Sequence, residues 1–138
     1  MTAAVASHTL SRDEVASWAR ELYANAVDRK DAAGFAAVFT PDAWLRFGNN
    51  LPLTGPDAIR EAIAGFFQAM VSLRHESKGI FLDGDTLFLE AVVTYTRHDG
   101  TTVSVPAMTV FQLAGKRQGT IMADNCRIYV DLAPLFAP

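Results

Sequence analysis

The stretch TLFLEAVVTYTRHDGTTVSVPAMTVFQL (Thr86–Leu113) decides the fold class of this chain. Two runs rich in Val, Thr, Phe and Leu flank the pair Asp99-Gly100. Asp-Gly between two β-rich runs is a strong hairpin signal, because these residues accept the backbone angles of a tight turn. The sequence therefore predicts two antiparallel strands, over residues 86–96 and 102–113.

Similar runs extend the sheet on both sides of this hairpin. RHESKGIFL (74–82) leads into the turn Asp83-Gly84-Asp85, and TIMADNCRIYVDL (120–132) follows a turn predicted at Ala114-Gly115-Lys116. AWLRF (43–47) has the length and composition of one more short strand. We therefore expect a mostly antiparallel sheet of about five strands.

The segment before the sheet is predicted to be helical. Ser11-Arg12-Asp13-Glu14 forms a capping box, and apolar residues recur behind it at helical spacing to about residue 28. A second, short helix over 31–40 is predicted to end at Thr40-Pro41, because proline disfavours helix at the residue before it. A third begins at Gly55-Pro56-Asp57, with proline in its first turn.

Three helices followed by antiparallel strands predict an α+β fold, in which the N-terminal helices pack on one face of a curved sheet. Such a cone-shaped layer encloses a cavity, and alternate residues of each strand point towards it. We expect a single domain over residues 1–138, with an ordered core of about 11–136. Functional residues are expected among the inward positions.

The composition argues against several classes of partner. Half of the 138 residues are hydrophobic, and the 12 basic residues are scattered through a chain of net charge −3, so no nucleic acid is expected. The apolar runs are too short to cross a bilayer, so no membrane partner is expected. MTAAVASHTLSRDE lacks the basic opening and the apolar core of a signal peptide, so we expect a cytoplasmic protein.

Neither a metal site nor another cofactor is expected. Cys126 is the only cysteine, which excludes an internal disulfide and a cysteine-based zinc site. It is interpreted as a small buried hydrophobic residue. No second histidine stands at ligand spacing from His75, and no cluster of His, Asp and Glu appears in the sequence.

Three segments carry a resemblance to a known family: YANAVDRKDAAGFAAVF (23–39), FGNNLPLTGPDAI (47–59) and CRIYVDLAPLF (126–136). Together with the order of the elements, they resemble the SnoaL-like branch of the nuclear transport factor 2-like superfamily. That superfamily includes ketosteroid isomerase, polyketide cyclases, scytalone dehydratase and limonene epoxide hydrolase. The resemblance implies a cone-shaped fold and a homodimer formed through the outer face of the sheet, where Arg127, Tyr129 and Asp131 are expected. It does not fix the reaction, because this fold hosts many chemistries.

The ketosteroid isomerase site is only partly kept. Its catalytic tyrosine corresponds to Tyr23, but its general base corresponds to Phe47. The second hydrogen-bond donor to the oxyanion corresponds to Thr109 if Phe111 is matched to the family phenylalanine, or to Met108 otherwise. Because phenylalanine cannot accept a proton, steroid isomerisation by that mechanism is not expected.

The limonene epoxide hydrolase site resembles the stretch around Asn49 more closely, but its catalytic triad is not kept. Its pair of tyrosine and asparagine resembles Phe47-Gly48-Asn49, with the asparagine kept and the tyrosine hydroxyl lost. Its triad of aspartate, arginine and aspartate corresponds to Thr94, Val92 and Ile128, none of which can activate water or protonate an epoxide. An epoxide hydrolase-like enzyme with an altered site stays open as an alternative.

Asp124, His75 and Tyr23 are the candidate catalytic residues. Matching Cys126 and Ile128 to inward positions turns Asp124 inward as well, where desolvation would raise its pKa and suit it to act as a base. The alternative places Asp124 in a solvated turn without a role. His75 is either a second base or a surface residue, and Tyr23 either reaches the cavity or lies along the helix surface.

The candidate ligand contacts come from several elements. Asn49 lies two residues beyond Phe47 and is predicted to point inward, where its amide offers both a donor and an acceptor, whereas Asn50 makes the turn. In the strand predicted over residues 86–96, Glu90 and Thr94 are predicted to point into the cavity. The substrate-binding candidates are Asn49, Phe47, Trp44, Phe67, Thr94, Thr109 and Phe111.

The leading interpretation is a cofactor-free small-molecule enzyme. We expect an isomerase, dehydratase or aldol-type cyclase that acts on a hydrophobic hydroxylated or carbonyl compound, such as a polyketide or terpenoid. The alternative is a non-catalytic module that holds an apolar ligand in the cone. A cavity of about 300 Å³ or more with converging polar groups would favour an enzyme or carrier, and a filled one a structural role.

Overall fold

The computed structural model describes residues 10–138 and contains helices at both ends of the chain. Three α-helices and one short 3₁₀-helix precede or interrupt the first strands, and one more short helix follows the last strand. Their bounds are α1 Arg12–Asn25, η1 Val27–Arg29, α2 Ala32–Ala36, α3 Pro56–Phe67 and α4 Ala133–Phe136. Within the described residues, no helix combines the length and apolar character needed to span a bilayer.

The strands form one sheet of six members, in the order β2-β1-β6-β5-β4-β3. All neighbours pair antiparallel except β1 and β6, which pair parallel. The bounds are β1 Phe39–Phe47, β2 Leu53–Thr54, β3 Ser72–Asp83, β4 Thr86–Thr96, β5 Thr102–Arg117 and β6 Thr120–Val130.

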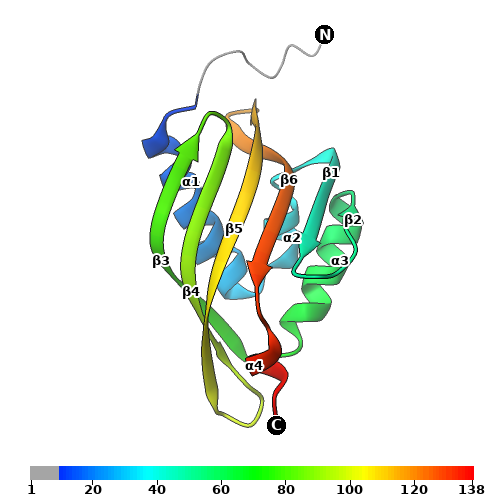
Figure 1. The fold of residues 1–138 in the computed structure, drawn as a ribbon. Coiled ribbons are helices and arrows are strands. Elements are labelled where there is room, and N and C mark those ends of the chain that lie inside the picture. The colour runs from blue at the N-terminus through cyan, green and yellow to red at the C-terminus, as the bar shows by residue number, and fades with distance from the viewer. Residues whose placement is uncertain (1–9) are drawn as a thin grey trace.

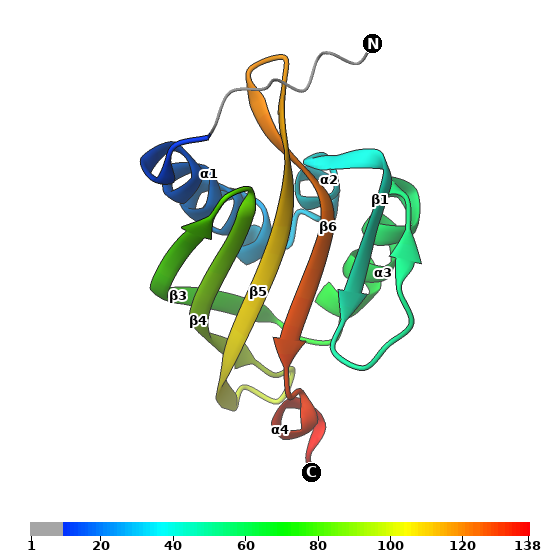
Figure 2. The same ribbon diagram turned by 45° about the horizontal axis from the view of Figure 1, so that its top comes forward.

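The sheet is curved and open, and α1, α2 and α3 lie against its concave face (Figures 1 and 2). This arrangement confirms the predicted α+β cone with three N-terminal helices. The prediction of about five strands missed only the two-residue β2, and α4 was not predicted.

Local sequence signals explain where the helices begin. At the start of α1, the Ser11 side chain accepts a hydrogen bond from the Glu14 backbone N–H at 3.1 Å, and Glu14 Oε2 accepts one from the Ser11 N–H at 3.0 Å. This is the predicted capping box. Helix α3 starts at Pro56 directly after Gly55, whose φ of 91° suits glycine.

The core lies between the helices and the concave face of the sheet. Its fully buried side chains include Phe111 on β5 and Leu45 on β1, together with Ile59 from α3. The Phe111 ring packs edge-on against Trp18 of α1 at 5.4 Å between centroids. Helix α1 is therefore held to the sheet by aromatic and aliphatic burial.

The alternation along β4 is opposite to the one predicted. Its buried residues are Leu87, Leu89, Ala91, Val93 and Tyr95. Thr94 and Glu90 therefore point to the outer face, and the prediction that they face the cavity is wrong. The residues of β4 that point outward also include Phe88 and Val92, so apolar residues occur on both faces of the strand. The sequence pattern therefore could not show which residues of β4 point into the cavity.

The turn between β5 and β6 is also displaced from its predicted position. Strand β5 continues to Arg117, and the chain reverses at Gln118 and Gly119, both with positive φ. Gly115, with φ of 83°, lies where the pairing of β5 and β6 shifts register. The glycine that suggested a turn at 114–116 therefore belongs to an irregularity within the strand.

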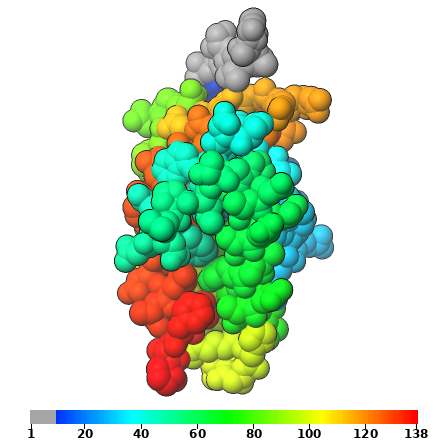
Figure 3. All heavy atoms as spheres, turned by 90° about the vertical axis from the view of Figure 1, so that its right-hand side faces the viewer, coloured from blue at the N-terminus to red at the C-terminus, as the bar shows by residue number. Residues whose placement is uncertain are grey.

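One end of the cone is tied together by the β4–β5 hairpin. Arg97 Nε donates to the Leu135 carbonyl of α4 at 3.1 Å, and its guanidinium also donates to the carbonyl of Pro134. On the other side, His98 Nε2 donates to the Gln68 carbonyl after α3 at 2.9 Å. Figure 3 shows α3 in green, the hairpin tip in yellow and α4 in red gathered at this end.

Candidate functional site

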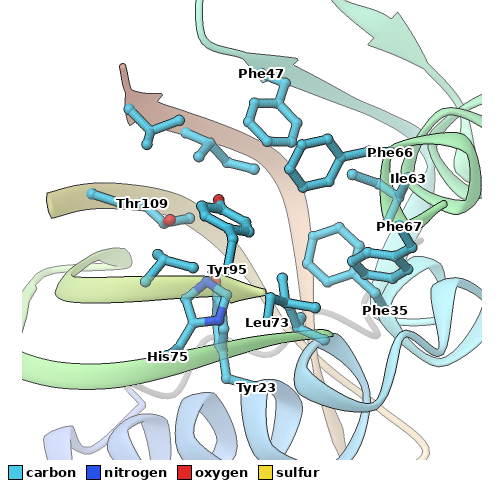
Figure 4. Close-up of a pocket in the computed structure, with 15 residues that line it drawn as sticks. Tyr23, Phe35, Phe47, Ile63, Phe66, Phe67, Leu73, His75, Tyr95 and Thr109 are labelled. Atoms are coloured by element: carbon cyan, nitrogen blue, oxygen red, sulfur yellow. The ribbon is translucent and has the colours of Figure 1, made fainter. Parts of the chain in front are cut away.

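A cavity opens between the concave face of the sheet and helices α1 and α3 (Figure 4). It contains about 500 Å³ of empty space including the part open to solvent, but the centres of water molecules can occupy only about 50 Å³ of it. The cavity is therefore neither filled nor wide, and it is best described as a narrow slot. Its walls are formed by Tyr23, Val27, Phe35, Phe47, Ile63, Phe66, Phe67, Leu73, His75, Val93, Tyr95, Ala107, Thr109, Ile128 and Val130.

The slot has a polar side and an aromatic side. The lining side chains that carry nitrogen or oxygen are Tyr23, His75, Tyr95 and Thr109. In Figure 4 these lie towards one side, and the labelled phenylalanines lie towards the other. A ligand in the slot would therefore meet hydrogen-bonding groups on one side and apolar rings on the other.

His75 on β3 forms a close pair with Asp28 of η1. Its Nδ1 lies 2.7 Å from Asp28 Oδ1, and its backbone N–H donates to Asp28 Oδ2 at 3.0 Å. The side chains are only 15% and 18% exposed. Because an ionised carboxylate can only accept hydrogen bonds, the proton of a neutral ring resides on Nδ1, and Nε2 keeps a free lone pair.

The free nitrogen of His75 is directed into the slot. In Figure 4 one ring nitrogen points away from α1, towards the side where Thr109 and Tyr95 lie. The His75 ring also packs edge-on against Tyr23, with 4.6 Å between the ring centroids. The carboxylate, the tyrosine ring and the strand thus fix the orientation of the imidazole.

Two tyrosine hydroxyls near His75 remain protonated at neutral pH. Burial raises the pKa of Tyr23 far above its ordinary value, although a hydrogen bond with Thr109 opposes the shift. Burial also raises the pKa of Tyr95 to about 12. Both side chains can therefore act as neutral hydrogen-bond donors in the slot.

The aromatic side is centred on Phe66, in the last turn of α3. Its ring lies 4.8 Å from Phe47 and 6.0 Å from Tyr95, both in edge-to-face geometry, and 6.4 Å from Phe67. Such contacts favour a fixed arrangement of the rings.

The structure brings some of the predicted site residues together. Tyr23, His75, Phe47, Phe67 and Thr109 all line the slot. They come from α1, β3, β1, α3 and β5, so the site is assembled from the whole length of the chain.

Four predicted ligand contacts lie elsewhere, namely Trp44, Thr94, Phe111 and Asn49. Trp44 points to the outer face, because alternation along β1 turns Leu45 and Phe47 inward. Thr94 also lies on the outer face, where its hydroxyl is 2.8 Å from that of Ser104. Phe111 has the predicted inward parity but is fully buried in the core beyond the slot.

The prediction that Asn49 points inward is wrong. Strand β1 ends at Phe47, and Gly48 with φ of 58° starts a turn, so the alternation on which the prediction depended stops before Asn49. Asn49 is exposed. Asn50 closes the turn, as predicted, by donating from Nδ2 to the Phe47 carbonyl at 3.0 Å.

Asp124 does not reach the slot either. Gln112 pairs with Asn125 and the next residue, Leu113, pairs with Ala123, so Asp124 is the extra residue of a β-bulge. The bulge breaks the alternation that was counted back from Cys126, and Asp124 is exposed. Desolvation still raises the pKa of its carboxyl group, but the group has no access to the slot.

Sequence reasoning missed Asp28 and Tyr95. Asp28 stands in the charged run Asp28-Arg29-Lys30-Asp31, which is typical of a solvated helix end, and its partner His75 is distant in sequence. Tyr95 was missed because the inward and outward residues of β4 were predicted the wrong way round. Within residues 10–138, no group of three or more His, Cys, Asp or Glu side chains could hold a metal ion.

The curved α+β cone is the fold of nuclear transport factor 2-like proteins of known structure. A family model described as the SnoaL-like domain matches residues 19–121, and the chain belongs to the SnoaL-like family. The resemblance noted in the sequence is thereby confirmed. No protein with a curated description matches the chain.

Solved structures share the fold at low sequence identity. ActVI-ORFA from Streptomyces coelicolor has a TM-score of 0.75 and 20% identity, over 86% of this chain and 96% of its own. A proposed SnoaL-like polyketide cyclase from Jannaschia sp. CCS1 has a TM-score of 0.71 and 18% identity, over 96% and 99%. A proposed scytalone dehydratase from Novosphingobium aromaticivorans has a TM-score of 0.71 and 13% identity, over 85% and 81%.

Proposed function

We propose that this protein is a cofactor-free enzyme that moves a proton at carbon in a flat, hydrophobic carbonyl or hydroxylated compound. The observation that carries the proposal is the His75–Asp28 pair, whose 2.7 Å contact leaves Nε2 free at the wall of an apolar slot. Isomerisation, dehydration and aldol-type cyclisation all begin with such a proton transfer. The family, and the cyclase and dehydratase proposed for two fold relatives, support the same class.

The geometry suggests a role for each polar group. Nε2 of His75 takes a proton from the carbon beside a carbonyl group, and the Asp28 carboxylate stabilises the imidazolium that results. The hydroxyl of Tyr95 is an available donor to the oxygen on which negative charge develops. The Tyr23–Thr109 pair supplies one more, because only one of its two hydroxyl protons is used in the hydrogen bond between them. His75 then returns the proton to another carbon in an isomerisation, or to a departing hydroxyl in a dehydration.

The test uses 2-tetralone, a flat aromatic ketone with acidic protons beside its carbonyl group. In D₂O, the wild-type protein is expected to accelerate exchange of these protons, measured by NMR. His75→Gln should lower the accelerated rate by about 10²- to 10⁴-fold. Asp124→Asn is the control and should keep the wild-type rate, because Asp124 lies outside the slot. A wild type that is no faster than His75→Gln would contradict the proposal.

The mostly apolar lining of the slot supports one second candidate, a binding module for a small apolar ligand. Binding of 2-tetralone without accelerated exchange would support this alternative. An epoxide hydrolase-like reaction has less support, because no carboxylate is among the residues that line the slot.

We also propose that the protein is a homodimer that forms through the outer face of the sheet, in the cytoplasm. Tyr129 on β6 is a large side chain that is 48% exposed there. Light scattering of wild-type protein and Tyr129→Asp should show a dimer and a monomer, and a monomeric wild type would refute this.

A further inference from the structure

A second hollow lies between α1 and strands β3 and β4. It contains about 520 Å³ of empty space including the part open to solvent, and the centres of water molecules can occupy about 180 Å³ of it. Its walls include Arg20 and Ala24 of α1, Asp28 of η1 and Ser77 of β3. Water therefore has more room here than in the slot, where the corresponding volume is about 50 Å³.

The two spaces meet at the proton-transfer pair. His75 and Tyr23 line both the slot and the hollow, so their side chains form the partition between them. Asp28 lines the hollow and is absent from the walls of the slot. The imidazole is thus reached from the slot on its Nε2 side, and its Asp28 partner is reached from the hollow.

This arrangement matters when a ligand fills the slot. A flat apolar ligand excludes water from a narrow cavity, so Nε2 of His75 then has no solvent neighbour. Water is expected to stay in the hollow at the same time, because the polar side chains of Asp28, Arg20 and Ser77 line it and can hydrogen-bond to water. Water on that side stays available to the pair.

We infer that the hollow between α1 and β3 is a solvent port, through which the Nδ1 proton of His75 exchanges with water while the slot is occupied. During turnover, which rests on the proposed function, the C–H bond of the ligand breaks and its proton bonds to Nε2. The contact between Nδ1 and Asp28 opens transiently, and the Nδ1 proton is replaced by one from a water in the hollow, so the ring stays an imidazolium beside the carbanion of the ligand. Nε2 then returns its proton to a carbon of the ligand or to a departing hydroxyl, and the resting ring, with its proton on Nδ1, is restored before the product leaves.

The inference is tested by blocking each space separately. Ala24 is exposed on α1 and lines the hollow, so Ala24→Phe should fill the port without disturbing the core. In ¹⁵N-labelled protein, the exchange rate of the His75 Nδ1 proton with water is measured by NMR. Ala24→Phe is expected to slow this exchange by about tenfold or more.

Three further variants separate the port from other causes. Ser77→Tyr blocks the hollow from the β3 side and should slow exchange in the same way. Ala62→Phe makes the same change as Ala24→Phe at an exposed position of α3 and should leave the rate unchanged. Ala107→Leu narrows the slot and should also leave the rate unchanged.

Two outcomes would overturn the inference. Unchanged exchange in both folded hollow-blocking variants would show that water does not reach His75 by this path. Slower exchange in Ala107→Leu than in Ala24→Phe would show that water enters through the slot instead. The measurement needs no turnover, so a protein that shows the expected exchange but does not act on 2-tetralone would refute only the proposed function.

Discussion

Thr94 and Tyr95 are neighbours on β4, yet they belong to different chemical environments. Thr94 points to the outer face, where its hydroxyl lies 2.8 Å from that of Ser104. Tyr95 points into the slot, and within residues 10–138 its hydroxyl makes no hydrogen bond. Arg46 and Tyr129 form a second pair on the outer face, where an Arg46 guanidinium N–H donates to the Tyr129 hydroxyl at 3.1 Å, whereas the hydroxyl of Tyr95 stays available for a ligand.

This difference teaches that the face of a residue, more than its type, decides what its side chain can do here. A paired hydroxyl on the outer face has little to offer a ligand, because its hydrogen-bonding capacity is already used. An unpaired hydroxyl at an apolar cavity gains a partner only when a ligand or water supplies one. The following predictions test this contrast between the two faces, starting with the largest effect.

The largest contrast is expected between two phenylalanines. Phe111 is fully buried on the inner face, so Phe111→Ala should lower the free energy of unfolding by about 3–5 kcal/mol. Phe81 is 57% exposed on β3, so Phe81→Ala should change it by only about 0.5 kcal/mol. Urea denaturation measures both, and similar losses would mean that both faces are equally buried in solution.

The next effect concerns Asp28, which orients His75 on the inner side. Asp28→Asn keeps the size of the side chain but removes the charge that stabilises the imidazolium, so 2-tetralone exchange should fall by about 10²-fold. Asp28→Glu restores the charge and should recover part of the rate. If Asp28→Asn exchanges as fast as wild type, His75 works without its partner, or another group is the base.

A smaller effect should separate the two neighbours on β4. Tyr95→Phe removes a hydroxyl from the slot and should weaken binding of 2-tetralone by about 0.5–1.5 kcal/mol, the worth of one hydrogen bond. Thr94→Val removes a hydroxyl from the outer face and should leave that affinity unchanged. Calorimetric titration gives both values, and equal affinities in the two variants would remove Tyr95 from the binding site.

The smallest effect is a dependence of stability on pH at Asp124. Desolvation raises the pKa of this carboxyl group in the folded protein, so the folded state holds its proton to a higher pH than the unfolded state does. Stability from this group is therefore lost as pH rises from the ordinary aspartate pKa through the raised one. Asp124→Asn should melt slightly above wild type at pH 7 and equally at pH 3, and a variant less stable at pH 7 would contradict this.

The fold could be predicted because its signals are local. The capping box at Ser11, the proline at the start of α3 and the Asp-Gly pair before β5 each act within a few residues. The site depended instead on facts that local patterns do not contain. No local sequence pattern predicts the β-bulge at Asp124. The pairing of Asp28 with His75 joins two segments that are distant in sequence and meet only in the folded chain.

The face of each strand was predictable only in part. Thr109 was placed in the slot because it was matched to a family position, whereas Thr94 was misplaced by counting along a strand with apolar residues on both faces. A shift by one residue inverts every such assignment. Residues on β4 were therefore assigned to the wrong face as a group.

The parallel pairing of β1 with β6 has a consequence for how the chain assembles. Phe39 pairs with Ala123 and Phe47 with Ile128. Strand β1 therefore cannot pair with β6, its main partner, until β6 has been synthesised. Until then, the nascent chain leaves one edge of β1 unpaired, and contacts this distant in sequence form slowly. Phe47 and Ile128 both line the slot, so the slot is complete only when synthesis has nearly finished. A chain interrupted before β6 would contain α1, α2, α3 and the central hairpin, but it would lack Ile128 and Val130 of the wall of the slot.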